Sequence, residues 1–267
     1  TTSFKEQLKA ADLPITDILE DDIDCLCMGF DTELTFKKLE DVSRLLLTRE
    51  SIPYIATNPD WVCPTAFGYV PDCGSVAEML SAKSIAKLLR ANPDSLEENV
   101  AIYTDLLKRI HATPVKPGEM PPIKATGEKW IEFLQPYLPA DQWEKLLGMM
   151  KAIPETGFMI HGDYHANNVM IQNGEPLLID MDTLCMGHPV FELGSMFNAF
   201  VGYSELNHQN MMDFFGYSFE TAGKFWNMAL KMYLGTEDEA VCQSVAEKAM
   251  IIGYTRMLRR AVRRPHE

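Results

Sequence analysis

Apolar positions in the first 77 residues form two short runs separated by a helical spacing. Residues 23–30 and residues 53–57 each fit a buried strand. Between them, apolar side chains recur at intervals of 3, 3 and 4 positions and share one helix face: Phe36, Leu39, Val42 and Leu46. A strand, a helix and a strand in this order predict a parallel pair joined by a right-handed crossover.

From about residue 75 the pattern becomes mainly helical. The predicted helices cover residues 81–90, 96–111, 128–137 and 141–153, and a proline-rich extended connection covers residues 113–123. A short β-rich stretch follows, with strands at 157–160, 169–171 and 177–179, and then further helices. The last helix carries an apolar face made of Val241, Val245, Ala249 and Ile252.

These patterns predict an α/β chain (α+β overall) with two domains. A small α/β segment occupies residues 1–77, and a mainly helical domain with a short β-hairpin occupies residues 78–267. The composition, 46% hydrophobic and 23% charged over 267 residues, excludes collagen-like, disordered and disulfide-scaffold classes. No run approaches the length of a membrane span, so we expect no membrane partner.

The net charge and the cysteines indicate which binding partners and which cellular compartment to expect. The net charge of −14 argues against nonspecific binding to nucleic acid or anionic membranes. One basic patch has a helical spacing that favours a solvated face over a phosphate site: Arg256, Arg259, Arg260, Arg263 and Arg264. Cys25 and Cys27 share one face of the first strand, where we expect small buried apolar residues. Free thiols and the lack of a signal-like start predict a cytoplasmic protein.

The candidate chemistry lies in the β-rich stretch, where the chain reads H-x-D-x-x-x-x-N from His161 to Asn168. An aspartate, Asp180, follows at the end of a predicted strand. Phosphoryl transfer needs a carboxylate that orients the hydroxyl and accepts its proton, which Asp163 supplies. It also needs hard oxygen ligands for Mg²⁺ at the nucleotide phosphates, and Asn168 with Asp180 would supply them.

The spacing of this motif predicts its local structure. One strand enters the loop, a second leaves it, and Asn173-Gly174 is a hairpin signal that returns the chain to Asp180. We therefore expect Asp163, Asn168 and Asp180 to converge on one cleft, with His161 holding the loop through backbone hydrogen bonds. Two other interpretations remain open: a purely structural turn, and a zinc site formed by His161, His165 and Asp163.

Residues 78–267, which carry this motif, resemble the C-terminal lobe of the aminoglycoside phosphotransferase and choline kinase-like family. The matching blocks are Gly162-Asp163 with Asn168, Ile179-Asp180 and residues 188–193. The resemblance implies a protein-kinase-like C-lobe, Asp163 as catalytic base, and Asn168 with Asp180 as Mg²⁺ ligands. It also implies ATP and a small-molecule hydroxyl as partners. Glu192 stands where the family usually has an aspartate that braces the loop.

The segment before this lobe lacks the usual nucleotide-holding parts of a kinase. It has no G-x-G-x-x-G and no strand-borne lysine of the V-A-I-K type. Its early lysines fall in helical patterns that predict a solvated face: Lys5, Lys9, Lys37 and Lys38. The pattern therefore predicts a phosphotransferase whose activity is impaired.

Residues 1–77 instead resemble part of a haloacid-dehalogenase-type phosphatase, in its p-nitrophenylphosphatase-like branch. The matching blocks are residues 24–35, 55–60 and 71–75, and they correspond to the cap domain. Asp31-x-Glu33-x-Thr35 is similar to the D-x-D-x-T nucleophile motif, so Asp31 is an alternative nucleophile for phosphomonoester hydrolysis. Glu33 replaces the second aspartate, which favours an ordinary loop residue at Asp31. A third hypothesis is a catalytically silent binding or scaffold protein with a vestigial magnesium site.

Overall fold

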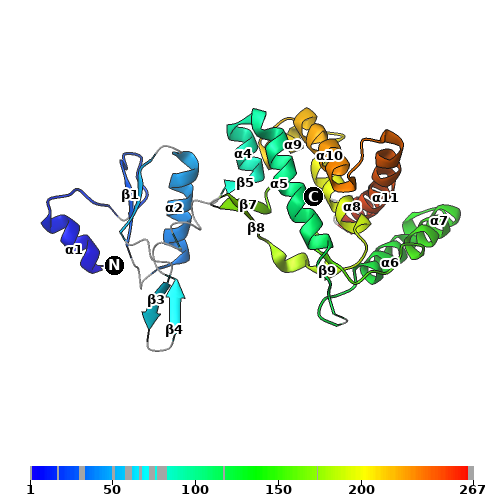
Figure 1. Cartoon of the computed structure of the whole chain (residues 1–267), viewed down its shortest axis with the longest axis horizontal. Helices are drawn as coiled ribbons and strands as arrows, with labels where there is room; N and C mark the ends of the chain where they lie inside the picture. Colours follow the sequence, from blue (N-terminus) through cyan, green and yellow to red (C-terminus); the bar gives the residue numbers. More distant parts are fainter. Residues whose placement is uncertain are drawn as a thin grey trace. The chain divides into compact units, whose positions relative to one another are not determined.

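The chain divides into two compact units, Thr1–Ala82 and Lys83–Glu267, in the computed structural model (Figure 1). The structure describes residues 2–16, 18–29, 34–49, 52–57, 62–65, 68–71, 76, 83–116, 118–172 and 174–263. No helix in these ranges combines the length and the apolar character needed to cross a membrane.

The first unit contains a parallel strand pair and an antiparallel hairpin. Its described elements include α1 (Thr2–Ala10), β1 (Leu26–Met28), α2 (Phe36–Thr48), β2 (Tyr54–Ala56), β3 (Val62–Thr65) and β4 (Gly68–Pro71). β1 and β2 run parallel, with Leu26 opposite Tyr54 and Met28 opposite Ala56, which confirms the predicted pair and the helix between them. Thr35 caps α2, because its side chain accepts a hydrogen bond from the backbone N–H of Lys38.

The prediction that Cys25 and Cys27 are buried is wrong. Cys25 and Cys27 do share a face, but both are exposed, while Leu26 and Met28 on the opposite face are partly buried. The two-residue period of a strand decides which side chains lie together. Which of the two faces is buried depends on packing, and the larger Leu and Met side chains bury more apolar area than cysteine does.

The second unit is mainly helical. Its helices are α4 (Ile85–Ala91), α5 (Leu96–His111), α6 (Ile123–Leu134), α7 (Ala140–Lys151), α8 (Val190–Phe200), α9 (Gln209–Phe215), α10 (Phe219–Leu234) and α11 (Glu239–Arg263). Single 3₁₀ turns occur at Pro93–Ser95, Gln135–Tyr137, Met181–Thr183 and Gly202–Ser204. Two small antiparallel sheets accompany the helices: β5 (Lys83–Ser84), β7 (Val169–Gln172) and β8 (Glu175–Leu178), in the order β5-β7-β8, and β6 (Met159–Ile160) with β9 (Cys185–Met186).

Prolines explain where the helix predicted at 128–137 differs from the structure. α6 begins at Ile123, directly after Pro122, and its α-helical part ends at Leu134. Pro136 lacks a backbone N–H and cannot continue an α-helix, so the last three predicted residues form a 3₁₀ turn instead. α5 has the predicted bounds, and the predicted hairpin is present as β7 and β8.

Two hydrophobic clusters form the core of the second unit. The larger joins α5, α8 and α10 through fully buried aromatic rings, with Phe200 stacked on Phe225 at a centroid distance of 4.5 Å. The smaller joins α6 and α7 to β6 and β9 around Trp130 and Ile160. Tyr164 belongs to the first cluster and Ile160 to the second, so both cores anchor the loop that begins at His161.

α11 buries a face that differs slightly from the predicted one. Ala249 and Ile252 are buried as expected, but Val241 is exposed and its neighbour Cys242 is buried instead. In the first turn of α11, Cys242 rather than Val241 therefore faces the core.

Candidate active site

The loop from His161 to Asn168 connects β6 to β7 and begins with a tight backbone turn. Gly162 has φ +86°, and a Cβ at this position would lie 2.5 Å from the carbonyl oxygen of Thr183. Both the positive φ and the close approach require glycine. Thr183 also binds the residue before Gly162, because its hydroxyl donates to the carbonyl of His161 at 2.7 Å.

Glu192, in the first turn of α8, holds the start of this loop. Its fully buried carboxylate accepts hydrogen bonds from the backbone N–H groups of His161 (2.6 Å), Gly162 (3.1 Å to each oxygen) and Tyr164 (3.3 Å). The positive end of the helix dipole also favours a carboxylate in a first turn. These are the contacts expected of a residue that supports the loop.

His161 links the loop to the strand end that carries Asp180. Its ring is buried, and its Nδ1 accepts a hydrogen bond from the backbone N–H of Asp163 at 3.3 Å. Its Nε2 lies 3.0 Å from the carbonyl oxygen of Ile179, so the neutral tautomer that is protonated at Nε2 satisfies both bonds. Since both ring nitrogens are engaged with the backbone, His161 is not a metal ligand in this geometry.

Tyr164 fastens the loop to α5, a contact that the sequence pattern does not reveal. The Tyr164 hydroxyl donates to the carbonyl of Tyr103 at 2.7 Å, and the Tyr103 hydroxyl donates to the carbonyl of Tyr164 at 3.0 Å. The two rings lie 4.4 Å apart and both are fully buried. This reciprocal pair satisfies two hydroxyls and two carbonyls inside an apolar core.

Asp163 presents a partly exposed carboxylate beside a histidine. Its side chain is 41% exposed, and its Oδ2 lies 3.7 Å from Nε2 of His165. Burial acts to raise the pKa of Asp163, but the contact with His165 and the electrostatic effect of His165 and Arg256 together lower it below its ordinary value. The carboxylate is therefore ionised at neutral pH.

Asn168 lies between the loop and the end of β8. Its amide nitrogen donates to the carbonyl of Asp163 at 3.0 Å, which leaves the amide oxygen for another partner. Its own carbonyl accepts from the backbone N–H of Ile179 at 3.1 Å. Asp180 follows directly, exposed and in the left-handed region at φ 59° and ψ 57°, a conformation that few residues other than glycine adopt.

The donor set suits magnesium better than zinc. The described ranges contain no group of three or more His, Cys, Asp or Glu side chains arranged to hold a metal ion, so the zinc interpretation of His161, His165 and Asp163 is wrong. One amide oxygen and one carboxylate are the few hard ligands that Mg²⁺ takes from a protein when phosphates and water complete its shell. By their chemical type, the side chains of Asn168 and Asp180 therefore suit Mg²⁺ better than Zn²⁺.

Comparison with known proteins identifies the family. The model of the Phosphotransferase enzyme family matches residues 63–222, more than half of the chain. The chain belongs to this family. The match begins ahead of residue 78, where the resemblance was expected to start, and it includes the whole loop and Asp180.

Two solved structures resemble this phosphotransferase family member. The 4-nitrophenylphosphatase of Thermotoga maritima is 34% identical over 30% of this chain, with a TM-score of 0.27, and the chain spans only 29% of its length. A choline/ethanolamine kinase family protein of Mesorhizobium loti is 13% identical, with a TM-score of 0.34, over 96% of this chain and 100% of that one. No curated protein matches the sequence.

The alternative nucleophile of this phosphotransferase family member, Asp31, lies outside the residues that the structure describes, as does Glu33. Thr35 of the same motif is described, and its side chain caps α2. The assignment of Asp31 therefore stays a prediction.

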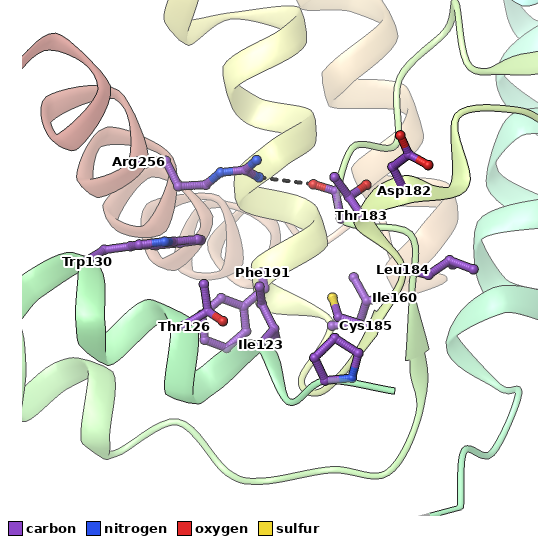
Figure 2. Close-up of a pocket in the computed structure, with 12 residues that line it drawn as sticks. Ile123, Thr126, Trp130, Ile160, Asp182, Thr183, Leu184, Cys185, Phe191 and Arg256 are labelled. Carbon is purple, nitrogen blue, oxygen red and sulfur yellow. Dashed lines mark hydrogen bonds between the residues drawn. The ribbon is translucent and has the colours of Figure 1, made fainter. Parts of the chain in front are cut away.

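A pocket of about 250 Å³ lies beside Gly162. No sequence pattern predicts it. Arg256 on α11 lies on its wall, half-buried, and donates to the carbonyl of Gly162 at 3.2 Å. Its guanidinium also lies 5.5 Å from the ring centre of Trp130 on α6 (Figure 2). The solvated face predicted for this arginine patch is therefore wrong at Arg256, because tertiary packing turns that side chain onto the loop.

Proposed function

We propose that this chain transfers a phosphoryl group from ATP to the hydroxyl of a small molecule, with Mg²⁺ as cofactor. One observation carries the proposal: an ionised, accessible Asp163 sits on a loop that Glu192, His161 and Tyr164 hold rigidly. Catalysis of this kind depends mainly on positioning and electrostatics, so a rigid carboxylate is its central part.

Each predicted site residue has a role in this proposal. Asp163 orients the acceptor hydroxyl and takes its proton, while Glu192 and His161 fix the loop that carries it. The amide oxygen of Asn168 and the carboxylate of Asp180 would hold Mg²⁺. When bound, Mg²⁺ neutralises charge on the nucleotide phosphates. The left-handed backbone at Asp180 fits this assignment, since strained conformations concentrate at functional sites.

We assign residues 78–267 to a kinase-like C-lobe and residues 1–77 to a haloacid-dehalogenase-like fragment. The helical second unit with its hairpin supports the first assignment, and the parallel β1–β2 pair supports the second. On this assignment the chain has few groups to clamp a nucleotide, so transfer is slow. A cytoplasmic location belongs to the same proposal.

The test is ATP-dependent phosphorylation of a mixture of small polyols, followed by mass spectrometry of the products with and without Mg²⁺. Asp163→Asn should lower the rate by about 10²–10⁴-fold, because it removes the proton acceptor and leaves the size unchanged. Asp105→Asn is the matched control, since Asp105 is an exposed aspartate on α5.

Three outcomes would contradict the proposal. Transfer that Asp163→Asn leaves unchanged would remove this loop from the chemistry. Hydrolysis of phosphomonoesters without transfer would favour a phosphatase. No turnover under any condition, with Mg²⁺ still bound, would favour a silent binding protein.

A further inference from the structure

The pocket beside Gly162 has the position and size of a binding site for a small acceptor. Its volume, about 250 Å³, is below that of pockets for drug-sized ligands and suits a molecule of monosaccharide size. Trp130 from α6, Ile160 from β6 and Phe191 from α8 provide its apolar walls (Figure 2). Gly162 lines the pocket and directly precedes Asp163, so a bound molecule lies next to the loop that carries the carboxylate.

Arg256 makes the wall of this pocket positively charged. Its guanidinium has five N–H donors, and among the described residues it donates to the carbonyl of Gly162, so donors remain for a ligand. Within the described part of the chain, no carboxylate lies within ion-pair distance of Arg256. Asp182 also lines the pocket, but Figure 2 shows its carboxylate pointing away from the other labelled side chains.

The aromatic wall is already occupied by a cation of the chain itself. The guanidinium of Arg256 lies 5.5 Å from the ring centre of Trp130, which is the geometry of a cation–π contact. An alkylammonium ligand would have to displace Arg256 from this ring and would be repelled by its charge. The pocket therefore disfavours amino-alcohol and amino-sugar acceptors and favours a ligand with a negative charge.

We infer that the acceptor is a small polyol with a terminal anionic group. Arg256 binds this group, Phe191 lies against the carbon chain, and the hydroxyl reaches Asp163. This inference rests on the proposed phosphotransferase function, which it extends by naming the chemical class of the substrate and the residue that selects it.

Matched probes of different charge test the inference by calorimetric binding to the full chain. Gluconate, glucitol and glucamine have similar hydroxyl chains with terminal groups of charge −1, 0 and +1, and glucitol 6-phosphate distinguishes a phosphate from a carboxylate. We expect one of the anions to bind about tenfold or more tightly than glucitol, because charge-assisted hydrogen bonds to a guanidinium contribute this much. Glucamine should bind most weakly.

Variants of Arg256 assign the selectivity to one side chain. Arg256→Gln should remove the preference for the anion, whereas Arg256→Lys should keep part of it, because lysine retains the charge without the planar donor fork. Arg260→Gln is the matched control, since Arg260 is an exposed arginine on the same helix. Glucitol binding and the midpoint of thermal unfolding show that each variant is folded.

The inference is overturned if glucitol or glucamine binds as tightly as both anions. It is also overturned if Arg256→Gln and Arg260→Gln weaken anion binding equally, which would indicate a diffuse basic surface. The two proposals fail separately. If the anion binds through Arg256 but no transfer depends on Asp163, the proposed function is wrong. If transfer depends on Asp163 but anions are not preferred, only the acceptor class is wrong.

Discussion

Glu192 accepts hydrogen bonds from three backbone N–H groups of the loop. It is a fully buried carboxylate, and a buried charge is tolerated only where hydrogen bonds and favourable dipoles compensate for lost hydration. Three backbone N–H groups of the loop and the N-terminal turn of α8 provide this compensation. His111 on α5 adds a contact, with its Nε2 3.9 Å from Oε2 of Glu192.

Replacing Glu192 with glutamine should destabilise the protein by about 1–3 kcal/mol, because one acceptor oxygen becomes a donor that faces other donors. The free energy of unfolding in urea measures this change. Glu192→Asp should be milder, since both oxygens remain. Glu220→Gln is the control, because Glu220 also lies in the first turn of a helix but is exposed. A Glu192→Gln protein as stable as the parent would show that these hydrogen bonds contribute little.

At the scale of elements, the turn at Gly162 sets how β6, the loop and the 3₁₀ turn at Met181–Thr183 approach one another. The chain passes so close to Thr183 that no side chain fits at Gly162. The loop thereby places Asp163 directly after a tight turn, with the β7–β8 hairpin returning the chain to Asp180. These close contacts fix the backbone of the loop that carries Asp163.

Gly162→Ala should destabilise the second unit by about 1–3 kcal/mol, because alanine adds a clash and disfavours the positive φ. The rate of phosphoryl transfer should fall by a larger factor than the loss of stability explains, because the loop that carries Asp163 must shift. Gly223→Ala is the control on α10, where an added Cβ meets no atom within 4 Å, and it should be neutral or slightly stabilising. Thermal unfolding and the transfer assay together check both variants. Equal behaviour of the two alanine variants would contradict the close approach at Gly162.

At the scale of the whole molecule, the chain joins two compact units with different architectures. The second holds the proposed base and magnesium ligands, and the first has a parallel strand pair and a hairpin. On the proposed assignment of residues 1–77, the chain lacks the clamp contacts of a kinase. Such contacts act on charge that develops during transfer, so their loss lowers the rate more than the affinity. We expect measurable but weak nucleotide binding.

Calorimetric titration of ATP should show binding that requires Mg²⁺ and that Asp180→Ala removes. Asp180→Ala removes a carboxylate ligand of Mg²⁺, and the phosphates of the nucleotide do not replace a ligand that comes from the protein. Asp105→Ala serves as the control, as an exposed aspartate remote in sequence from the loop. Binding that persists in Asp180→Ala would place the metal elsewhere. Tight binding with brisk transfer would mean that residues 1–77 form a working nucleotide lobe.

Local sequence patterns determine several elements of this protein. The bounds of α5, the parallel β1–β2 pair and the β7–β8 hairpin follow from the spacing of apolar residues and from turn signals, which act over a few positions. Turn signals likewise place His161, Asp163, Asn168 and Asp180 on one loop and the hairpin that follows it.

Tertiary structure alone decided which faces are buried and which distant residues meet the loop. Cys27 on β1 and Cys25 just before it are exposed, because the two-residue period shows which side chains share a face but not what packs over that face. Tyr103 and Arg256 reach the loop from α5 and α11, 61 and 94 positions away from their partners. No local pattern encodes such contacts, because they arise only when separate helices pack around a common core.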